Sequence, residues 1–183
     1  SKVVAPAAPW VFGAGTIGFA VVPAYLTANG ADRLLYSTIC VAVTLGFGVL
    51  IQSLARRLHD PYSARAILSG LLIVGGGVAL LAGAMALNSL VLGVVASAFF
   101  GSGYGMILVA GLIETQHLSP PGQLGRYTGR YYTFAYLGFL APTVLAFLGQ
   151  WISPTWQLVL IAILLAVSLG TVLMNSRTAI KQY

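Results

Sequence analysis

Long stretches without a charged side chain divide this sequence and constrain its fold more than any other feature. No Asp, Glu, Lys or Arg occurs in residues 3–31, 34–55, 66–113 and 131–176. A helix needs about 20 apolar residues to cross the ~30 Å hydrocarbon core of a bilayer. Only 7% of all residues are charged, whereas soluble domains carry roughly 25%, because a surface in water must be polar. The sequence therefore predicts a membrane protein.

The number of membrane spans follows from the lengths of these stretches. The first two stretches each hold one crossing, whereas the last two are too long for one helix and contain turn-forming residues near their middle. These residues are Asn88-Ser89 and the segment 150–155, which includes Ser153-Pro154. We predict six helices, at about 9–28, 34–55, 65–86, 89–113, 129–150 and 155–175. Because the period-two alternation of a membrane barrel is missing, the expected fold class is an all-α polytopic membrane protein, with one domain over residues 1–183.

Positive charges fall almost entirely on one side of the six predicted spans. Of the nine Lys and Arg residues, eight share the side that includes both ends of the chain: Lys2, Arg56, Arg57, Arg65, Arg126, Arg130, Arg177 and Lys181. The other side carries Arg33 alone. The positive-inside rule predicts that both termini are cytoplasmic. We expect a multi-pass protein of the cell (inner) membrane. Topology then explains the net charge of +6, and no nucleic-acid partner is expected.

The beginning of the chain carries neither a methionine nor a signal-peptide cleavage pattern. It reads Ser-Lys-Val-Val, and the apolar run that follows has no small-residue cleavage site. We therefore expect a fragment of a longer protein or a processed chain.

Glycines recur inside the predicted spans. Residues 13–18 read GAGTIG, which matches the glycine pattern of a dinucleotide-binding loop, but that loop needs a strand before it and a helix after it. Here the motif lies within the first predicted helix, so nucleotide binding is not expected. Gly101-x-x-x-Gly105 and the series Gly75, Ala79, Gly83 form small-xxx-small faces. Such faces let helices approach closely in lipid, either for static packing or as surfaces that move during a working cycle.

No catalytic or metal-binding group can be assigned from the sequence. The segment 99–103 resembles the Gly-x-Ser-Gly segment of rhomboid proteases, but Ser102 would need a base to take its proton. The two histidines, His59 and His117, fall in predicted connections, two spans apart and without a nearby cysteine. Cys40 lies in an apolar run and is expected to be a buried spectator. We expect no metal and no cofactor.

The polar groups that remain within the spans are neutral. No carboxylate, lysine or arginine is predicted at mid-membrane depth, since Glu114 lies at the inner end of the fourth helix. Helical spacing groups aromatic and hydroxyl side chains on three faces: Tyr36, Cys40 and Thr44; Ser97, Phe100 and Tyr104; Tyr132, Tyr136, Phe139 and Thr143. Such side chains suit a pocket for an amphipathic or apolar ligand. Hydrogen bonding and packing between helices explain them equally well, and both interpretations stay open here.

Three segments resemble one transporter family. They are Pro6 to Gly13; Leu54-Ala55-Arg56-Arg57 with Arg65; and Glu114 to Arg126 followed by Gly129, Tyr131-Tyr132, Tyr136-Leu137-Gly138-Phe139 and Pro142. Over essentially its whole length the chain resembles the carboxy-terminal half, helices seven to twelve, of a major facilitator superfamily transporter. The basic loop of that family ordinarily reads Gly-x-x-x-Asp-Arg-x-Gly-Arg. This chain has Gln52 at the glycine and Arg56 at the aspartate, so the acidic partner is missing or is replaced by Asp60.

The resemblance implies a half bundle with a 3+3 inverted repeat. Such a bundle pairs with an amino-terminal six-helix half, and the two rock about a central site to move a small-molecule substrate. By position, helices one and four line the cavity, two and five flank it, and three and six lie outermost. The implied lining residues are Thr16, Tyr25, Phe100 and Tyr104, with Tyr36, Thr44, Tyr132 and Tyr136 at the flanks. The implied cytoplasmic gate comprises Arg56, Arg57, Asp60, Arg65, Glu114, Arg126 and Arg130.

Two other functions remain as alternatives to a transporter half embedded in membrane lipid. One is an integral membrane subunit that transports nothing and serves as a packing module. The other is an intramembrane protease, which the position of the histidines disfavours.

Overall fold

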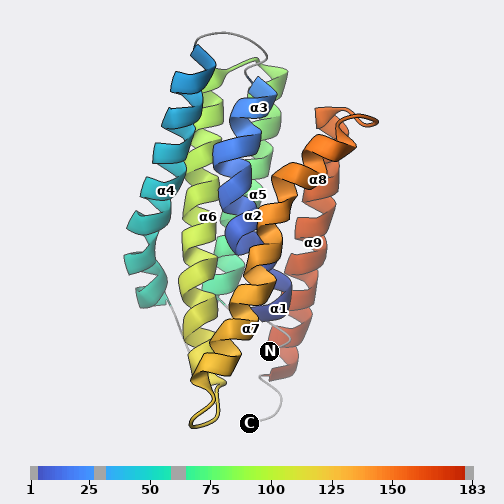
Figure 1. Cartoon of the computed structure of the whole chain (residues 1–183). Helices are drawn as coiled ribbons and strands as arrows, with labels where there is room; N and C mark the ends of the chain where they lie inside the picture. Colours follow the sequence, from blue (N-terminus) through green and yellow to red (C-terminus); the bar gives the residue numbers. More distant parts are fainter. Residues whose placement is uncertain (1–3, 27–31, 59–64, 180–183) are drawn as a thin grey trace.

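The protein folds into a bundle of helices, and no strand occurs in the part of the chain that the structure describes. The computed structural model describes residues 4–26, 32–58 and 65–179 (Figure 1). The helices are α1 (Val4–Ala7), α2 (Pro9–Thr16), the π-helix η1 (Ile17–Val21), α3 (Val22–Leu26), α4 (Asp32–Leu58), α5 (Arg65–Ala86), α6 (Leu90–His117), α7 (Leu124–Tyr136), the 3₁₀-helix η2 (Leu137–Leu140), α8 (Ala141–Leu148) and α9 (Pro154–Ala179). The first four run end to end, and we call them together the first rod.

Six of the described helical segments are long and apolar enough to cross a membrane. They are the first rod, α4, α5, α6, the continuous run α7–η2–α8, and α9. The predicted all-α class and the predicted number of spans are therefore confirmed. By length and composition this is a multi-pass membrane protein.

Several predicted helix ends were wrong by a few residues. The first rod begins at Val4 rather than near residue 9, α6 continues to His117, and α7 already begins at Leu124. The first rod begins inside its own charge-free stretch, whereas in α6 and α7 the charge-free stretch covers only part of the helix. Backbone hydrogen bonding continues beyond it, so Arg126 and Arg130 lie in the first two turns of α7.

The turn predicted between α5 and α6 has the expected chemistry. Asn88 adopts a left-handed backbone conformation with φ of 49°, which asparagine tolerates better than most residues. Ser89 follows as the N-cap of α6, and its hydroxyl accepts a hydrogen bond from the Leu92 N–H at 3.3 Å. At the later predicted turn, α9 begins directly at Pro154, where the missing N–H of proline costs nothing.

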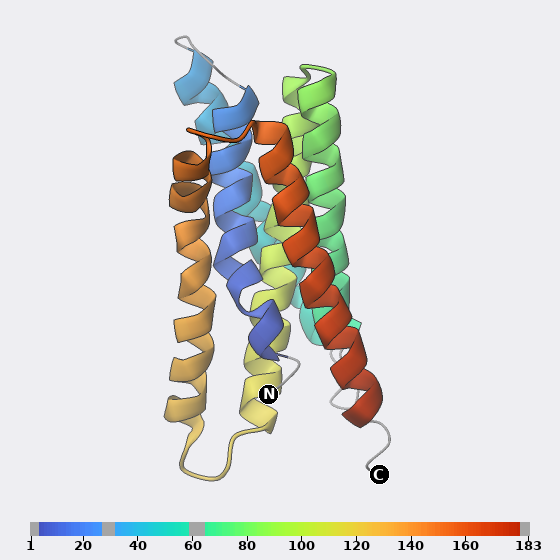
Figure 2. The same ribbon diagram turned by 90° about the vertical axis from the view of Figure 1, so that its right-hand side faces the viewer.

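The rods run alternately up and down, so the beginning of α1 and the end of α9 lie at the same end of the bundle (Figure 1). The first rod lies centrally and contacts α4, α6, α7 with η2, and α9. In Figure 2 it lies between α7–α8 and α9. Helix α6 packs along α4 and α5. As a result, α4, α7–α8 and α9 leave large apolar faces exposed.

The glycines of α6 bring it close to α4. A Cβ atom at Gly101 would overlap the carbonyl of Thr44, and one at Gly105 would overlap the carbonyl of Gly48. This small-xxx-small face therefore packs directly on the α4 backbone, as lipid-embedded helices prefer. The other face does not pack in this way: Ala79 is exposed, and Gly83 has open space where a side chain would begin.

The GAGTIG segment lies inside the first rod and serves packing. A Cβ atom built at Gly13 would lie 3.7 Å from the Cα of Gly138, and one at Gly15 would lie 3.8 Å from the ring of Tyr104. Gly18 is wedged between α4 and α6. Gly13 thus faces η2, Gly15 faces α6 and Gly18 faces both α4 and α6, and the dinucleotide-loop alternative has no support from the fold.

Candidate functional site

Four aromatic side chains from two rods form a partly exposed cluster, which we call the aromatic cluster: Phe12, Tyr132, Tyr136 and Phe139. The Phe12 ring centroid lies 4.5 Å from that of Phe139 and 5.2 Å from that of Tyr136, and in both pairs the planes are within 15° of parallel. Tyr132 stacks on Tyr136 at 5.9 Å. Tyr136 keeps 55% and Phe139 46% of its surface exposed. The spacing of residues 132, 136 and 139 had predicted one common face, and the stacking of their rings agrees with that.

A close backbone contact positions this cluster. Gly138, in η2, lies so near the first rod that a side chain there would overlap the Pro9 carbonyl. The Thr16 hydroxyl donates to the Gly13 carbonyl at 3.0 Å and lies 3.4 Å from the Gly138 carbonyl. Because the two backbones touch at this point, the Phe12 ring comes within stacking distance of Phe139.

A second group of polar side chains surrounds the π-helix of the first rod. The Val22 N–H bonds to the Ile17 carbonyl, five residues back, and Ser97 of α6 donates its hydroxyl to the Gly18 carbonyl at 2.8 Å. Thr44 of α4 donates to the Ser97 carbonyl at 3.3 Å. These hydroxyls therefore join three rods to one another inside the bundle.

The candidate lining residues fall into two groups by exposure. Tyr136 is exposed and Tyr132, Tyr104 and Tyr25 are partly buried, whereas Thr16, Tyr36, Thr44 and Phe100 are buried in this conformation. Tyr36 donates to the Leu90 carbonyl at 2.9 Å, and the Phe100 ring lies against Gly77. The structure thus brings Tyr132 and Tyr136 together at a surface and leaves the buried four between helices. Thr143, assigned to the same face as the tyrosines, is exposed on α8.

Two hydrogen bonds between the first rod and α9 were not predicted from the sequence. Gln157 is 2% exposed; it accepts a hydrogen bond from the Tyr25 hydroxyl and donates to the Ile152 carbonyl at 3.2 Å. Trp10 donates its indole N–H to the Ser168 hydroxyl at 2.8 Å and is buried. Its ring packs inward against α9. A glutamine within a charge-free stretch was the available signal for Gln157.

The described gate candidates gather at one end of the bundle, where α4 and α6 end and α5 and α7 begin (Figure 1). Arg56, Arg65, Arg126 and Arg130 are exposed there, and Glu114 is partly buried. Among the described residues, Glu114 forms no ion pair with Arg126 or Arg130. Asp60 and the side chain of Arg57 lie outside the described residues.

The protease alternative finds no dyad in the described part of the chain. Ser102 and His117 belong to the same helix, α6, fifteen residues apart, which is about 22 Å along its axis. His59 lies outside the described residues. Where the structure describes the chain, no three His, Cys, Asp or Glu side chains gather as metal ligands would, and the Cys40 thiol is buried.

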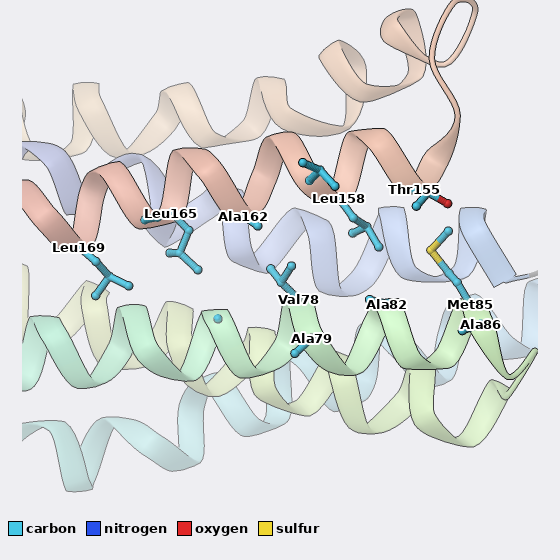
Figure 3. A pocket seen from close by; sticks show the side chains of 13 residues that line it. Val78, Ala79, Ala82, Met85, Ala86, Thr155, Leu158, Ala162, Leu165 and Leu169 are labelled. Atoms are coloured by element: carbon cyan, nitrogen blue, oxygen red, sulfur yellow. The ribbon is translucent and has the colours of Figure 1, made fainter.

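An apolar groove of about 590 Å³ runs between α5 and α9 (Figure 3). We call it the α5–α9 groove. Its lining residues are Gly75, Val78, Ala79, Ala82, Met85 and Ala86 of α5, and Thr155, Leu158, Val159, Ala162, Leu165, Ala166 and Leu169 of α9.

Comparison with known proteins gives no relative for this chain. It matches no protein-family model, no curated protein and no solved structure. The inference of function therefore rests on the sequence and on the geometry described above.

Proposed function

We propose that this chain is one six-helix half of a membrane transporter that moves a small molecule by alternating access. The observation that carries the proposal is the pattern of neighbours in the bundle. Numbering the six rods in chain order, the exchange of rods one, two and three with rods four, five and six maps the principal neighbouring pairs onto neighbouring pairs, with far more extensive packing of α6 on α4 and α5 than of the first rod on their counterparts.

The equivalence can be followed contact by contact. The contact between the first rod and α4 corresponds to the contact between α6 and α7. The contact between the first rod and α7 with η2 corresponds to the contact between α6 and α4. The contact between the first rod and α9 corresponds to the contact between α6 and α5. The contact between α5 and α9 corresponds to itself, because the exchange turns each of these helices into the other. Because three rods make up each set, the second set starts at the opposite end of the bundle. This is the pattern expected of the 3+3 inverted repeat of major facilitator transporters.

The distribution of burial supports the same proposal. The first rod is much the most buried of the six spans, whereas α4 and α7–α8 are the least. In a two-half transporter, the second and fifth rods of a half would border the other half across the central cavity. The exposed faces of α4 and α7–α8 are then where an amino-terminal half would pack.

The aromatic cluster is the proposed substrate contact. It joins the first rod to α7 and η2, beside the faces left exposed, and it presents Tyr136 and Phe139. Stacked rings bind apolar or aromatic groups, and the hydroxyls of Tyr132 and Tyr136 can orient a polar end. In this proposal the charged end of the bundle serves as the cytoplasmic gate, and both termini are cytoplasmic.

A non-transporting membrane subunit is the second candidate, and one observation favours it. Most buried hydroxyls of the bundle, including those of Thr16, Tyr36, Thr44 and Ser97, are already engaged in hydrogen bonds to backbone carbonyls. Such bonds serve packing equally well in a protein that transports nothing.

A ligand screen on the full-length protein tests the proposal. Small molecules that raise its melting temperature in detergent are tested for uptake into proteoliposomes. We expect saturable uptake. Tyr136→Ala should weaken ligand binding by about tenfold, because the ligand loses its stacking on the Tyr136 ring and the apolar surface buried there. Phe147→Ala, which removes an aromatic side chain on α8 outside the cluster, should leave binding unchanged. Ligands that bind without being taken up would favour the non-transporting subunit.

A further inference from the structure

The α5–α9 groove follows the long axis of the bundle. Helices α5 and α9 run antiparallel, so the Thr155 end of the groove lies beside Met85 and Ala86, and its other end lies beside Gly75, Leu165 and Leu169 (Figure 3). From Thr155 to Leu169 the α9 backbone advances by fourteen residues, or about 21 Å. That is most of the ~30 Å thickness of a bilayer core and more than one leaflet.

Two features keep the groove open. The first is the set of small side chains along it: alanines 79, 82 and 86 on α5 and alanines 162 and 166 on α9. The second is the pair of hydrogen bonds that draw α9 toward the first rod, from Tyr25 to Gln157 and from Trp10 to Ser168. Because the first rod bonds to α9 at both Gln157 and Ser168, α9 does not move closer to α5 and cover its alanines.

The groove lies entirely within two segments that can span a membrane. Its walls are apolar except for the hydroxyl of Thr155 at one end, and none of the described residues that line it is Lys, Arg, Asp or Glu. The medium around these segments is lipid hydrocarbon, so an apolar chain is the species in contact with the opening. An ion or a sugar would find no charged partner there.

The width of the groove distinguishes among apolar occupants. Its volume of about 590 Å³ is spread over a length of about 21 Å, so it is long and narrow. A helix with its side chains is about 10–12 Å across and would lie over such a groove rather than in it. A single polymethylene chain, whose carbons contact neighbours at about 4 Å, fits this width.

We propose that one acyl chain of a membrane lipid occupies the α5–α9 groove and forms a fixed part of the bundle. The chain enters at Thr155, where the exposed indoles of Trp151 and Trp156 mark a suitable depth for the headgroup. It extends toward Leu165 and Leu169 and fills the space left by the alanines. Since no cation lines the mouth of the groove, the site selects the hydrocarbon chain and not the charge of the headgroup.

Photocrosslinking of the full-length protein in liposomes tests this site. The probe is a phosphatidylcholine with a diazirine along one acyl chain, and labelled residues are mapped by mass spectrometry. We expect labelling of α5 and α9 groove residues to exceed that of the exposed α4 face by about threefold, because a groove contacts the chain on several sides. The exposed α4 residues Leu45, Val49 and Leu50 supply the comparison.

Substitutions then fill the groove or leave it unchanged. Ala79→Phe with Ala162→Phe places two rings in the groove and should reduce its labelling to the level of the α4 face. Leu72→Phe with Leu164→Phe adds rings at exposed positions of the same helices outside the groove, and should leave groove labelling unchanged. If the double groove variant fails to fold, Ala82→Leu is used, with a smaller reduction expected.

Two results would overturn the proposal. Equal labelling of the groove and the α4 face would show that the groove contacts only freely exchanging bilayer lipid and holds no fixed acyl chain. A photoreactive residue placed at Ala79 or Ala162 that captures a second copy of the chain would assign the groove to a neighbouring protein. The labelling map needs no transport assay, so it remains decisive even if the transporter proposal fails.

Discussion

Single residues set the distances between rods in this bundle, most clearly where a side chain is missing. At Gly101 and Gly105 the backbones of α6 and α4 approach so closely that even a methyl group would overlap a carbonyl oxygen. Gly83 has the opposite surroundings, with nothing within reach of an added Cβ. Gly101 therefore has no room for a side chain, whereas Gly83 does. The sequence alone could not distinguish these two glycines, because the difference depends on the neighbouring helix.

We expect Gly101→Ala to destabilise the bundle by about 1–3 kcal/mol, because overpacking forces α4 away from α6. Gly83→Ala is the matched control and should be neutral or stabilising by up to about 1 kcal/mol, since alanine is the better helix former. Unfolding in detergent, followed by circular dichroism, measures both. Equal effects of the two substitutions would contradict the close contact at Gly101.

The proposed cytoplasmic gate can be tested at a single residue, Glu114. If Glu114 helps to hold the charged end closed, Glu114→Gln should increase labelling of a cysteine placed at Gly129, which is exposed near that end. A cysteine at Thr143, exposed on α8, should become less reactive, because alternating access opens one side at a time. Gln116→Ala serves as the control, and the buried Cys40 gives little background. Unchanged labelling at both positions would remove Glu114 from the gate.

At the scale of whole helices, the number and type of elements could be predicted, and their local deviations could not. Charge-free stretches and the signals at Asn88-Ser89 and Ser153-Pro154 sufficed for six spans. The π-helix at Ile17–Val21 and the 3₁₀ turn at Leu137–Leu140 were missed, because their causes lie on other rods. Ser97 bonds to the π-helix at Gly18, and Gly138 meets the first rod. The aromatic cluster was half predicted for the same reason: the spacing of its α7 side could be read locally, but the partner Phe12 could not.

Ser97→Ala should loosen the π-helix, because the Gly18 carbonyl then loses its donor in an apolar interior. We expect the free energy of unfolding to fall by about 1 kcal/mol, since hydrogen bonds between membrane helices contribute roughly 0.6 kcal/mol on average and up to about 1.7 kcal/mol. Ser53→Ala is the control, because Ser53 is exposed and bonds only to the Leu50 carbonyl of its own helix. A loss no larger for Ser97 than for Ser53 would argue against this anchoring.

At the scale of the whole molecule, the alternation of six spans makes a topology prediction. A tag inserted between Asn29 and Gly30 should lie on the opposite side of the membrane from a tag beside Arg57, and the latter should be cytoplasmic because of the arginines around it. Glycosylation or protease-protection reporters measure this. Tags that report the same compartment would contradict the six-span order.

The exposed apolar faces predict how the isolated chain behaves. With α4 and α7–α8 uncovered, the six helices alone should dimerise or aggregate in detergent, and co-expression with an amino-terminal half should yield a defined complex. Size-exclusion chromatography with light scattering distinguishes these states. A monodisperse monomer that transports without a partner would contradict the need for a second half.

The π-helix of the first rod sets the rotational phase of everything that follows it. Each α-helical residue turns the chain by about 100°, and a π-helical segment accommodates one residue more than the regular winding. Rewinding Ile17–Val21 as regular α-helix, with no residue removed, would rotate α3 by roughly that angle about its axis. Tyr25 would then turn away from Gln157, and α9 would lose its upper hydrogen bond to the first rod. One inserted residue, buried in the middle of the bundle, thus determines which helix the far end of the first rod holds.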